Sequence, residues 1–462
     1  MIGGGPAGLV VASVAAQAGL RVTLIEKTAR LGGDCLHTGC VPSKTLLHQA
    51  QLVQHARVAA ASGLLGAMPD VDFSVAMGKV RQAIEAIQAH DDPERFRGYG
   101  VDVRFGAARF TSPQELAVDD QLIRARYFVI ATGSEPAVPP VYGLEEAGFD
   151  TSDTIFGRNE LPARLAVLGG GPVGVELAQA FARFGSRVTL IELKSTLLPG
   201  MDALAADTLR DCLVGEGIEV ITGEQVASVR RDGDSRQLAF ESGATVECDR
   251  VLVATGRRPV LAGLGLEAAG VQYSRAGVTV DRRLRTAQHH IFAAGDVCGP
   301  FPMTHMAEYQ AGIVLANTVF RIPARTDYRV VPQVVYTDPE IATVGLDRAA
   351  AERLGIRHDE TEFALSGLDR AITEQQTAGF ARILLRRGRI AGATVVAPHA
   401  GELIHELALA MQVKARARDV SRLVHAYPSY AQLHRRTLNL HYASLLKSRR
   451  LRLLVWLLRL LP

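Results

Sequence analysis

The pattern of apolar and polar positions repeats once along this chain. Residues 3–26, GGGPAGLVVASVAAQAGLRVTLIE, align without a gap on residues 169–192, GGGPVGVELAQAFARFGSRVTLIE, and 14 of these 24 positions are identical. Each copy predicts a glycine turn, an alanine-rich helix without proline, a glycine that ends the helix, and a strand VTLI that ends in glutamate. The sequence therefore predicts two copies of one turn–helix–strand unit.

The glycines of both turns follow the spacing G-x-G-x-x-G; they are Gly3, Gly5 and Gly8 in the first copy and Gly169, Gly171 and Gly174 in the second. Missing side chains let the backbone approach a pyrophosphate at a helix N-terminus. Glu26 and Glu192, each 18 residues after the third glycine, stand where a carboxylate accepts hydrogen bonds from ribose hydroxyls. A single such motif also occurs in turns that bind nothing, but two copies with matching strand, helix and acid predict two dinucleotide sites.

Three further segments predict strands that end in turns of small residues. YFVIATGSEP at 127–136 and RVLVATGRRP at 250–259 form a second doubled element, suited to closing a nucleotide-binding unit. HIFAAGDVCG at 290–299 predicts a buried strand that delivers Asp296, an acceptor for another ribose-like hydroxyl chain. The alternative for Asp296 is an ordinary helix N-cap.

The segment LGGDCLHTGCVPSK at 31–44 carries the candidate chemistry, because Cys35 and Cys40 enclose four residues. Pro42 in the next turn predicts that Cys40 opens a helix, where the N-terminus lowers the pKa of a thiol. Lys44 follows on the same helical face, and Glu176 in the second glycine helix is its expected partner. A structural disulfide and half of a zinc site are the alternatives; the other three cysteines stand alone in the sequence, and we expect no metal site.

Composition narrows the class of protein. The chain has 462 residues, which predicts two to four domains, and its 48% apolar and 21% charged residues are typical of a globular protein. A net charge of +3 with interspersed signs argues against nucleic acid as a partner. Five scattered cysteines indicate a reducing, cytoplasmic setting, and the sequence has neither a stretch long enough to span a bilayer nor a secretion signal.

With these motifs the chain resembles the FAD-dependent pyridine nucleotide-disulfide oxidoreductases, in the group of dihydrolipoamide dehydrogenase, glutathione reductase and mercuric reductase. The resemblance covers essentially the whole chain and rests on GGGPAG, GGDCLHTGCVPSK, the two ATG turns, GGGPVGVE, AAGDV, THMAEYQAG and VVYTDPEIATVG. It implies an α/β fold with two Rossmann-like dinucleotide-binding domains, one for FAD and one for NAD(P), plus a C-terminal α+β dimerisation domain. A homodimer follows from that layout.

The resemblance also implies domain bounds and cofactor contacts. An FAD domain covers 1–140 and 263–330, an NAD(P) domain 141–262 and a dimerisation domain 331–446, which leaves a basic and apolar tail at 447–462. Hydride passes from the nicotinamide to the flavin and then, as two electrons, to the Cys35/Cys40 disulfide, with Cys40 as the charge-transfer thiol and Cys35 as the interchange thiol. Besides the two glycine turns, Glu26 and Glu192, the expected cofactor contacts are Lys44, Thr132, Gly133, Gly256, Asp296 and Ala307.

Two features qualify these implications. Glu192 should repel a 2′-phosphate and favour NADH, although Lys194 weakens that preference. In relatives that act on disulfides, a His-Pro-x-x-x-Glu motif protonates the departing thiolate, but HAYPSYAQ at 425–432 places Tyr427 and Gln432 at the aligned positions. Neither is a good acid or base near neutral pH, and His425 lies two residues off.

We therefore expect an NAD(P)H oxidoreductase of the mercuric-reductase-like kind, in which a redox-active Cys35/Cys40 disulfide serves an unidentified acceptor: a disulfide, a quinone or a metal ion. Mercuric reductases end in a cysteine pair, whereas no cysteine follows Cys298 here. Dihydrolipoamide dehydrogenase is the first alternative. A catalytically idle, membrane-associated flavoprotein scaffold is the second.

The two ends of the sequence add two expectations. Only Met1 and Ile2 precede the first glycine turn, too few for a central strand, so we expect the natural product to begin upstream. The tail RRLRLLVWLLRLLP at 449–462 combines arginines with apolar residues around the one tryptophan. Peripheral membrane contact and packing within the dimer both remain open for this tail.

Overall fold

The computed structural model describes residues 1–446 and 449–460. Contacts within the chain divide it into two compact units, which we describe one at a time. The first unit holds residues 1–169, 183–186 and 226–326; the second holds residues 170–182, 187–225 and the chain from 327 onward. These units do not test the expected domain bounds, which remain a prediction.

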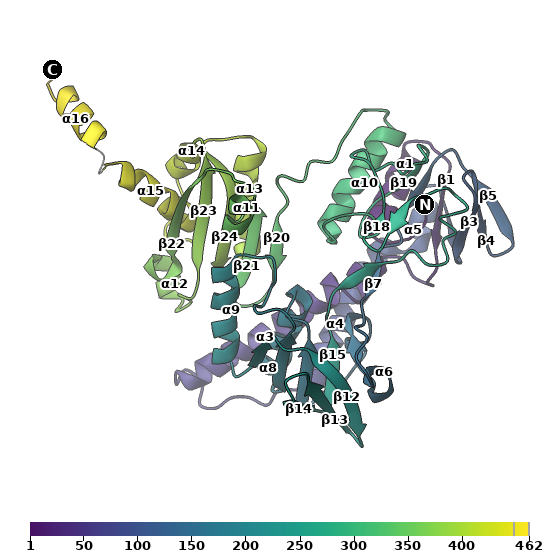
Figure 1. Ribbon diagram of the computed structural model, residues 1–462, viewed down its shortest axis with the longest axis horizontal. Helices are drawn as coiled ribbons and strands as arrows, with labels where there is room; N and C mark the ends of the chain where they lie inside the picture. Colours follow the sequence, from purple (N-terminus) through teal and green to yellow (C-terminus); the bar gives the residue numbers. More distant parts are fainter. Residues whose placement is uncertain (447–448, 461–462) are drawn as a thin grey trace. The chain divides into compact units, whose positions relative to one another are not determined.

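The first unit is an α/β structure (Figure 1). Its helices are α1 (Pro6–Gln17), α2 (Gly33–His37), α3 (Cys40–Ala61), α4 (Phe73–Gln88), α5 (Pro93–Gly98), α6 (Leu144–Ala147), α7 (Ser152–Ile155) and α10 (Thr304–Thr318), with the 3₁₀ turn η1 (Ala89–Asp91). Its strands are β1 (Val22–Glu26), β2 (Val101–Phe105), β3 (Ala108–Ser112), β4 (Glu115–Val118), β5 (Gln121–Arg124), β6 (Phe128–Ile130), β7 (Ser134–Pro136), β8 (Asp150–Thr151), β9 (Arg164–Leu168), β12 (Val226–Asp232), β13 (Ser235–Phe240), β14 (Thr245–Cys248), β15 (Arg250–Val253), β16 (Arg257–Pro259), β17 (Tyr273–Ser274), β18 (Gly277–Val278) and β19 (Ile291–Ala293).

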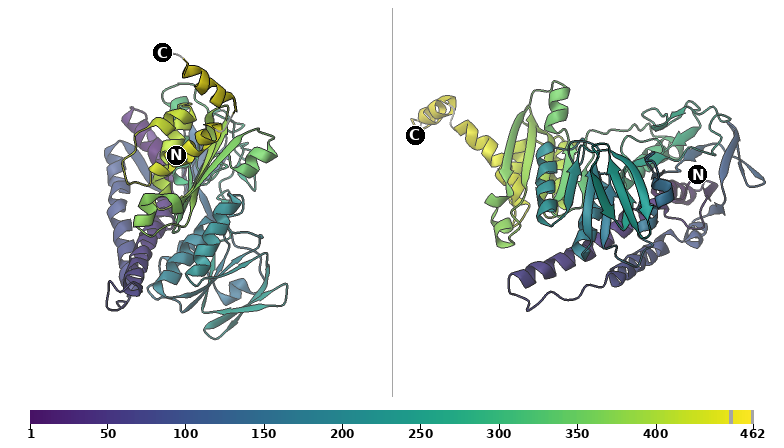
Figure 2. Two further views of the ribbon diagram at one scale, coloured as in Figure 1. Left: turned by 90° about the vertical axis from the view of Figure 1, so that its left-hand side faces the viewer. Right: turned by 60° about the horizontal axis from the view of Figure 1, so that its bottom comes forward.

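Parallel pairing positions the candidate site in this unit. Strand β1 pairs with β2, β6 with β19, and β15 with both β8 and β9, all in parallel. Helix α1 packs against α10 and β1, and the long helices α3 and α4 run side by side (Figure 2). The carboxyl ends of parallel strands are where α/β proteins bind ligands, so the turns after β6, β15 and β19 lie where a nucleotide is expected.

The short opening of the chain takes the place of a central strand. Ile2 forms parallel bridges to Ile25 of β1 and Ile130 of β6, and it is 4% exposed. The backbone N–H of Ile2 donates to the carbonyl of Val129 at 2.9 Å, and Gly3 donates to Ile25 at 2.8 Å. Burial lowers the pKa of the Met1 amino group to about 5. Ile2 thus makes the paired contacts of a central strand on both sides.

The second unit combines the rest of the repeated element with a separate antiparallel sheet. Its helices are α8 (Pro172–Phe184), α9 (Ala203–Gly215), α11 (Arg348–Arg353), α12 (Asp369–Thr373), α13 (Ala400–Gln412), α14 (Ala417–Arg422), α15 (Gln432–Leu446) and α16 (Arg449–Leu458), with the 3₁₀ turn η2 (Leu365–Gly367). Its strands are β10 (Arg187–Glu192), β11 (Glu219–Thr222), β20 (Gln333–Val335), β21 (Glu340–Gly345), β22 (Asp359–Ala364), β23 (Phe380–Arg386) and β24 (Arg389–Ala397). The sheet runs β20-β21-β24-β23-β22; α13 packs on β21 and β24, and α15 on β22 and β23.

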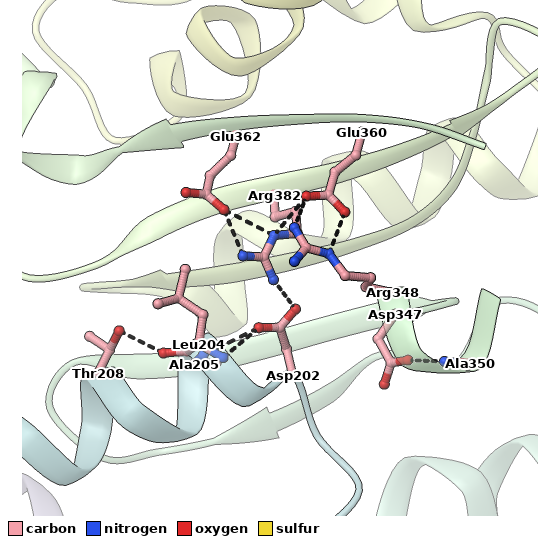
Figure 3. A network of polar contacts seen from close by, with 10 residues as sticks. All are labelled: Asp202, Leu204, Ala205, Thr208, Asp347, Arg348, Ala350, Glu360, Glu362 and Arg382. Atoms are coloured by element: carbon pink, nitrogen blue, oxygen red, sulfur yellow. Dashed lines mark hydrogen bonds and ion pairs between the residues drawn. The ribbon is translucent and has the colours of Figure 1, made fainter. Parts of the chain in front are cut away.

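A buried ion cluster fixes β23 to the start of α9 within this unit (Figure 3). The Arg382 guanidinium, 5% exposed, donates to the Asp202 carboxylate and, at 2.7 Å, to Glu362. Asp202 also caps α9 by accepting from the backbone of Leu204 at 3.0 Å. Glu360 lies 3.4 Å from Arg382 and accepts from Arg348 at 2.9 Å.

The structure confirms the elements predicted from the repeat. The two copies give α1 with β1 and α8 with β10, and both strands end at the predicted glutamates. The strands expected before the three small-residue turns are β6, β15 and β19. Of the tail, residues 449–460 are described and 447–448 and 461–462 lie outside the described residues. Within the part of the chain that the structure covers, no helix has the length and apolar character needed to cross a membrane.

Candidate active site

The two predicted redox cysteines lie on consecutive helices. Cys35 is in α2, and Cys40 is the first residue of α3, which confirms that it opens a helix. Gly39 permits the tight turn between them, because a Cβ there would lie 2.9 Å from the carbonyl oxygen of Asp34. The Cys40 side chain is exposed, and its Sγ lies 3.4 Å from the Thr304 hydroxyl at the start of α10. Thr304 is the first residue of the THMAEYQAG motif, but the sequence did not predict its contact with Cys40.

Both cysteines are free thiols, and the surroundings of Cys35 change its acidity. A hydrogen bond to Cys40, followed by burial, raises the pKa of Cys35. Cys35 therefore keeps its proton when the pair is reduced, and Cys40 is the sulfur placed to carry negative charge. A helix N-terminus stabilises a thiolate at that position. The expected roles, with Cys40 as the electron-rich thiol and Cys35 as the thiol that exchanges, stay a prediction.

The first glycine turn has the geometry of a pyrophosphate cradle. A Cβ at Gly3 would lie 2.2 Å from the Ala131 carbonyl oxygen, and one at Gly8 would lie 1.9 Å from that of Gly3, so packing alone requires both glycines. A Cβ at Gly5 would meet no atom closer than 3.8 Å. Gly5 is therefore unexplained by the protein's own packing, whereas a phosphate approaching its backbone explains it, and the residues fit FAD.

In the second turn, packing again requires the first glycine but not the middle one. A Cβ at Gly169 would lie 2.4 Å from the Ala254 carbonyl oxygen, whereas one at Gly171 would meet nothing within 4 Å. Gly174, the third glycine, lies in α8. The turn thus fits a second pyrophosphate by the same criterion.

Glu26 and Glu192 each accept hydrogen bonds from the backbone of the glycine turn in their own copy. Glu26 accepts from the backbone of Gly4 at 2.7 Å and of Thr28 at 2.8 Å, one bond on each carboxylate oxygen. Glu192 accepts in the same way from Gly170 and from Lys194, both at 2.7 Å. Both acids are buried, yet an ionised carboxylate has about four acceptor sites, so each retains capacity for a ribose hydroxyl.

Hydrogen bonds join the two ATG turns to each other within the first unit. The Thr132 hydroxyl donates to the Val260 carbonyl at 2.9 Å, and the backbone of Val260 donates to Gly133 at 3.0 Å. In return, Gly256 accepts from the backbone of Ala137 at 2.9 Å, and β7 pairs with β16. Gly133 and Gly256 have positive φ, so these contacts hold both turns in shape. Their contact with a cofactor stays a prediction.

Asp296 belongs to a polar group that the sequence did not predict. Its carboxylate accepts from the Ser134 hydroxyl at 2.7 Å, and that hydroxyl accepts from Arg257 Nε at 2.8 Å. The Arg257 guanidinium also pairs with Asp34, the residue before Cys35. Burial raises the pKa of Asp34, against the opposing effect of Arg257. Arg257 thus joins the turn after β15 to the redox segment.

Three other predicted residues are placed separately. Ala307 is buried in α10, and a Cβ at Gly295 would lie 3.5 Å from its methyl group, so it lies beside the Asp296 turn. Lys44 is in α3 of the first unit. Glu176 is in α8 of the second unit, where it accepts from the backbone of Tyr336 at 2.9 Å. The pairing of Lys44 with Glu176 stays a prediction.

The C-terminal segment carries no replacement for the expected dyad at the aligned positions. Tyr427 is 69% exposed, and a hydrogen bond to Asp369 raises its pKa, so it is a poorer acid than an ordinary tyrosine. Gln432, a neutral side chain, is buried at the start of α15.

His425 is held by a carboxylate instead. Its Nε2 lies 3.1 Å from the Glu406 carboxylate, and its Nδ1 lies 3.1 Å from the Leu423 carbonyl. Glu406 also contacts the buried His434 at 3.0 Å. Burial raises the pKa of Glu406, but the two histidines outweigh it and the net shift is downward.

Among the described residues, no group of three or more His, Cys, Asp or Glu side chains is arranged to hold a metal ion.

Comparisons with known proteins cover almost the whole chain. The family model described as pyridine nucleotide-disulphide oxidoreductase matches residues 1–312, and the model of that family's dimerisation domain matches residues 331–436. A dihydrolipoyl dehydrogenase of Thermus scotoductus is 36% identical over 440 residues, covering 94% of each chain. A mitochondrial dihydrolipoyl dehydrogenase of Pisum sativum is 33% identical over 447 residues, covering 94% of this chain and 89% of the relative.

A solved structure gives a comparable match. The Cu(II) complex of RclA, a HOCl-induced flavoprotein disulfide reductase of Escherichia coli, superposes with a TM-score of 0.87 at 29% identity. The match covers 95% of this chain and 99% of that one.

Proposed function

Because the chain belongs to the pyridine nucleotide-disulphide oxidoreductase family, whose members are FAD-dependent enzymes that use NAD(P)H, we propose that it carries electrons from NADH to a metal ion such as Cu(II). The matched dimerisation domain supports a homodimer. The overall reaction is NADH plus two Cu(II) giving NAD⁺, two Cu(I) and one proton. The scattered cysteines favour the cytoplasm as the compartment in which the enzyme acts.

The observation that carries this proposal is the altered C-terminal segment. Reduction of a disulfide needs a proton donor for the departing sulfur, and an acid of suitable pKa contributes about 10²- to 10⁴-fold in rate. Tyr427, whose pKa is raised by Asp369, and the neutral Gln432 are unsuited to this task. A metal ion that accepts electrons from sulfur needs no such acid. The Cu(II) bound to the structurally similar RclA supports this choice.

The chain's own residues have separable roles in this scheme. Bound FAD would supply the two-electron relay, held by the turn of Gly3, Gly5 and Gly8. Cys40 holds negative charge at the start of α3, with the Thr304 hydroxyl 3.4 Å from its sulfur. Cys35, the less exposed of the two sulfurs, keeps its proton until the acceptor arrives, because its pKa is raised.

The test is a comparison of two acceptors under saturating NADH. We expect chelated Cu(II) to support NADH oxidation at least about tenfold faster than lipoamide. The variant Cys35→Ser should lose that activity while its flavin is still reduced by NADH. Fast lipoamide reduction by the unaltered enzyme would contradict the proposal.

Restoring the dyad provides the converse test. Tyr427→His combined with Gln432→Glu should raise lipoamide turnover by about tenfold or more if the missing acid is the limit. The single variant Gln432→Glu is the control, because it adds a carboxylate without the imidazole. An unchanged lipoamide rate in the double variant would remove the argument from the missing acid.

Dihydrolipoyl dehydrogenase is the second candidate function, favoured by His425 as well as by the named relatives. The ring nitrogens of His425 lie within hydrogen-bond distance of the Leu423 carbonyl and the Glu406 carboxylate, which hold the imidazole in place. This imidazole lies two residues from the usual position in the sequence. If lipoamide turnover is fast, His425→Gln should abolish most of it.

A further inference from the structure

Helix α16 exposes large apolar side chains. The exposed fractions are 58% for Leu453, 58% for Trp456 and 65% for Leu460, which follows the helix. A helix that packs on its own unit hides such side chains along one face. Large apolar groups gathered at an exposed site indicate a surface for another partner.

The charge of the surrounding tail indicates which partner. Residues 447–462 contain five cations, Lys447, Arg449, Arg450, Arg452 and Arg459, and no Asp or Glu. The last acidic residue before them is Asp419. Trp456 is the one tryptophan in the chain. Arginines beside leucines and a tryptophan are typical of a helix that lies in the headgroup region of a bilayer.

A second copy of the tail is a poorer occupant than a lipid surface. Two tails packed on each other across a twofold axis would bring cations against cations, since neither tail contains an acidic residue. An anionic phospholipid surface supplies negative charge for the arginines and an apolar layer for the leucines. At 1.5 Å per residue, the ten residues of α16 span about 15 Å, enough to lie on a bilayer.

We propose that residues 449–460 attach this enzyme to the surface of membranes that contain anionic phospholipids. The attachment is peripheral and reversible. It goes beyond the proposed redox function and does not depend on which acceptor the enzyme reduces. Each tail cation contributes about fivefold to the partition onto an anionic bilayer, and added salt weakens that contribution.

The experiment uses the full-length, FAD-loaded protein and vesicles of phosphatidylcholine with a minority of phosphatidylglycerol. We expect the protein to sediment with these vesicles, and to do so at least about tenfold less with phosphatidylcholine alone. Because the tail holds the chain's one tryptophan, binding should also move the Trp456 emission to shorter wavelength. This signal reports burial of the tail itself.

Matched variants separate the tail from the rest of the surface. Leu453→Glu should reduce sedimentation at least about tenfold, whereas Leu354→Glu, at a site of similar exposure in another part of the chain, should leave it unchanged. Arg452→Gln combined with Arg459→Gln should reduce it about 25-fold. Flavin reduction by NADH should be unaltered in all three.

Three results would overturn the proposal. The first is sedimentation no greater with vesicles than without them. The second is sedimentation that Leu453→Glu and Leu354→Glu reduce equally. The third is a Trp456 emission that is already at short wavelength without vesicles and moves to longer wavelength on dilution, which would assign the tail to a second copy of the chain.

Discussion

Replacing Glu192 by glutamine removes one charge while keeping the shape of a side chain that closes the second glycine turn. Its two carboxylate oxygens accept from the backbone of Gly170 and of Lys194, each at 2.7 Å. An amide has one acceptor oxygen, so its NH₂ group must face the other backbone N–H, donor against donor. The turn that should hold the nicotinamide cofactor then loses one of its two supports.

The size of the effect follows from the lost bond. A hydrogen bond to a charged group contributes about 1.5–3 kcal/mol, which corresponds to about ten- to hundredfold in affinity. We expect Glu192→Gln to weaken the binding of NADH by this factor, which should appear as a higher KM and a lower kcat/KM. The preference for NADH over NADPH, measured as the ratio of their kcat/KM values, should also narrow, because a neutral glutamine does not repel a 2′-phosphate.

The repeat supplies the matched control. Glu26 makes the same pair of bonds in the first copy, to Gly4 at 2.7 Å and Thr28 at 2.8 Å. Glu26→Gln should lower the FAD content of the purified enzyme and leave the KM for NADH of the FAD-loaded fraction unchanged. A change of less than about threefold in NADH kinetics for Glu192→Gln would refute the reasoning, as would equal loss of FAD in both variants.

Three other predictions concern the thiols, the ion cluster and the half-buried Glu406 carboxylate. Cys40→Ser should abolish the long-wavelength absorption band of the two-electron-reduced enzyme, whereas Cys35→Ser should show that band without reduction; an unchanged band in Cys40→Ser would reverse the two roles. Arg382→Ala leaves Asp202 and Glu362 without their buried cation and should lower the free energy of unfolding by about 3–5 kcal/mol, measured by heat or urea. Arg348→Ala removes an exposed partner of the same cluster and should lower it by less than about 1 kcal/mol. The pKa of Glu406 is lowered from its ordinary 4.5, so its contribution to stability is present above that pH and is lost as pH falls through the lowered value. The stability difference between the enzyme and Glu406→Gln should therefore shrink below about pH 4; a difference that grows there would contradict this sign.

The parts of the fold that the sequence predicted are those with local signals. The repeated glycine turns, the alanine-rich helices and the VTLI strands are each specified within 24 residues, and the structure forms all of them. The start of α3 at Cys40 was predictable for the same reason, since Pro42 is an N-terminal signal. Relations between distant segments carry no such signal.

The contacts missed from the sequence join residues far apart in the chain. Thr304 lies 264 positions from Cys40, and Arg257 lies 223 positions from Asp34. A threonine or an arginine is unremarkable in its own segment, and only the fold shows which sulfur or carboxylate it meets. The buried pair of Arg382 with Asp202, 180 positions apart, is hidden in the same way.

The two strand-ending glutamates have a structural role that the sequence did not predict. Their role as acceptors for ribose hydroxyls stays a prediction, whereas in both copies the acid accepts a hydrogen bond from the backbone of the glycine turn. Because this hydrogen bond is the same in the two copies, it cannot distinguish one dinucleotide from another. The distinction must come from the residues that follow, where Thr28 adds a hydroxyl bond of 2.9 Å to Glu26 and the cationic residue Lys194 follows Glu192 by two positions. The preference for NADH is therefore a balance between Glu192 and Lys194 rather than a property of the acid alone.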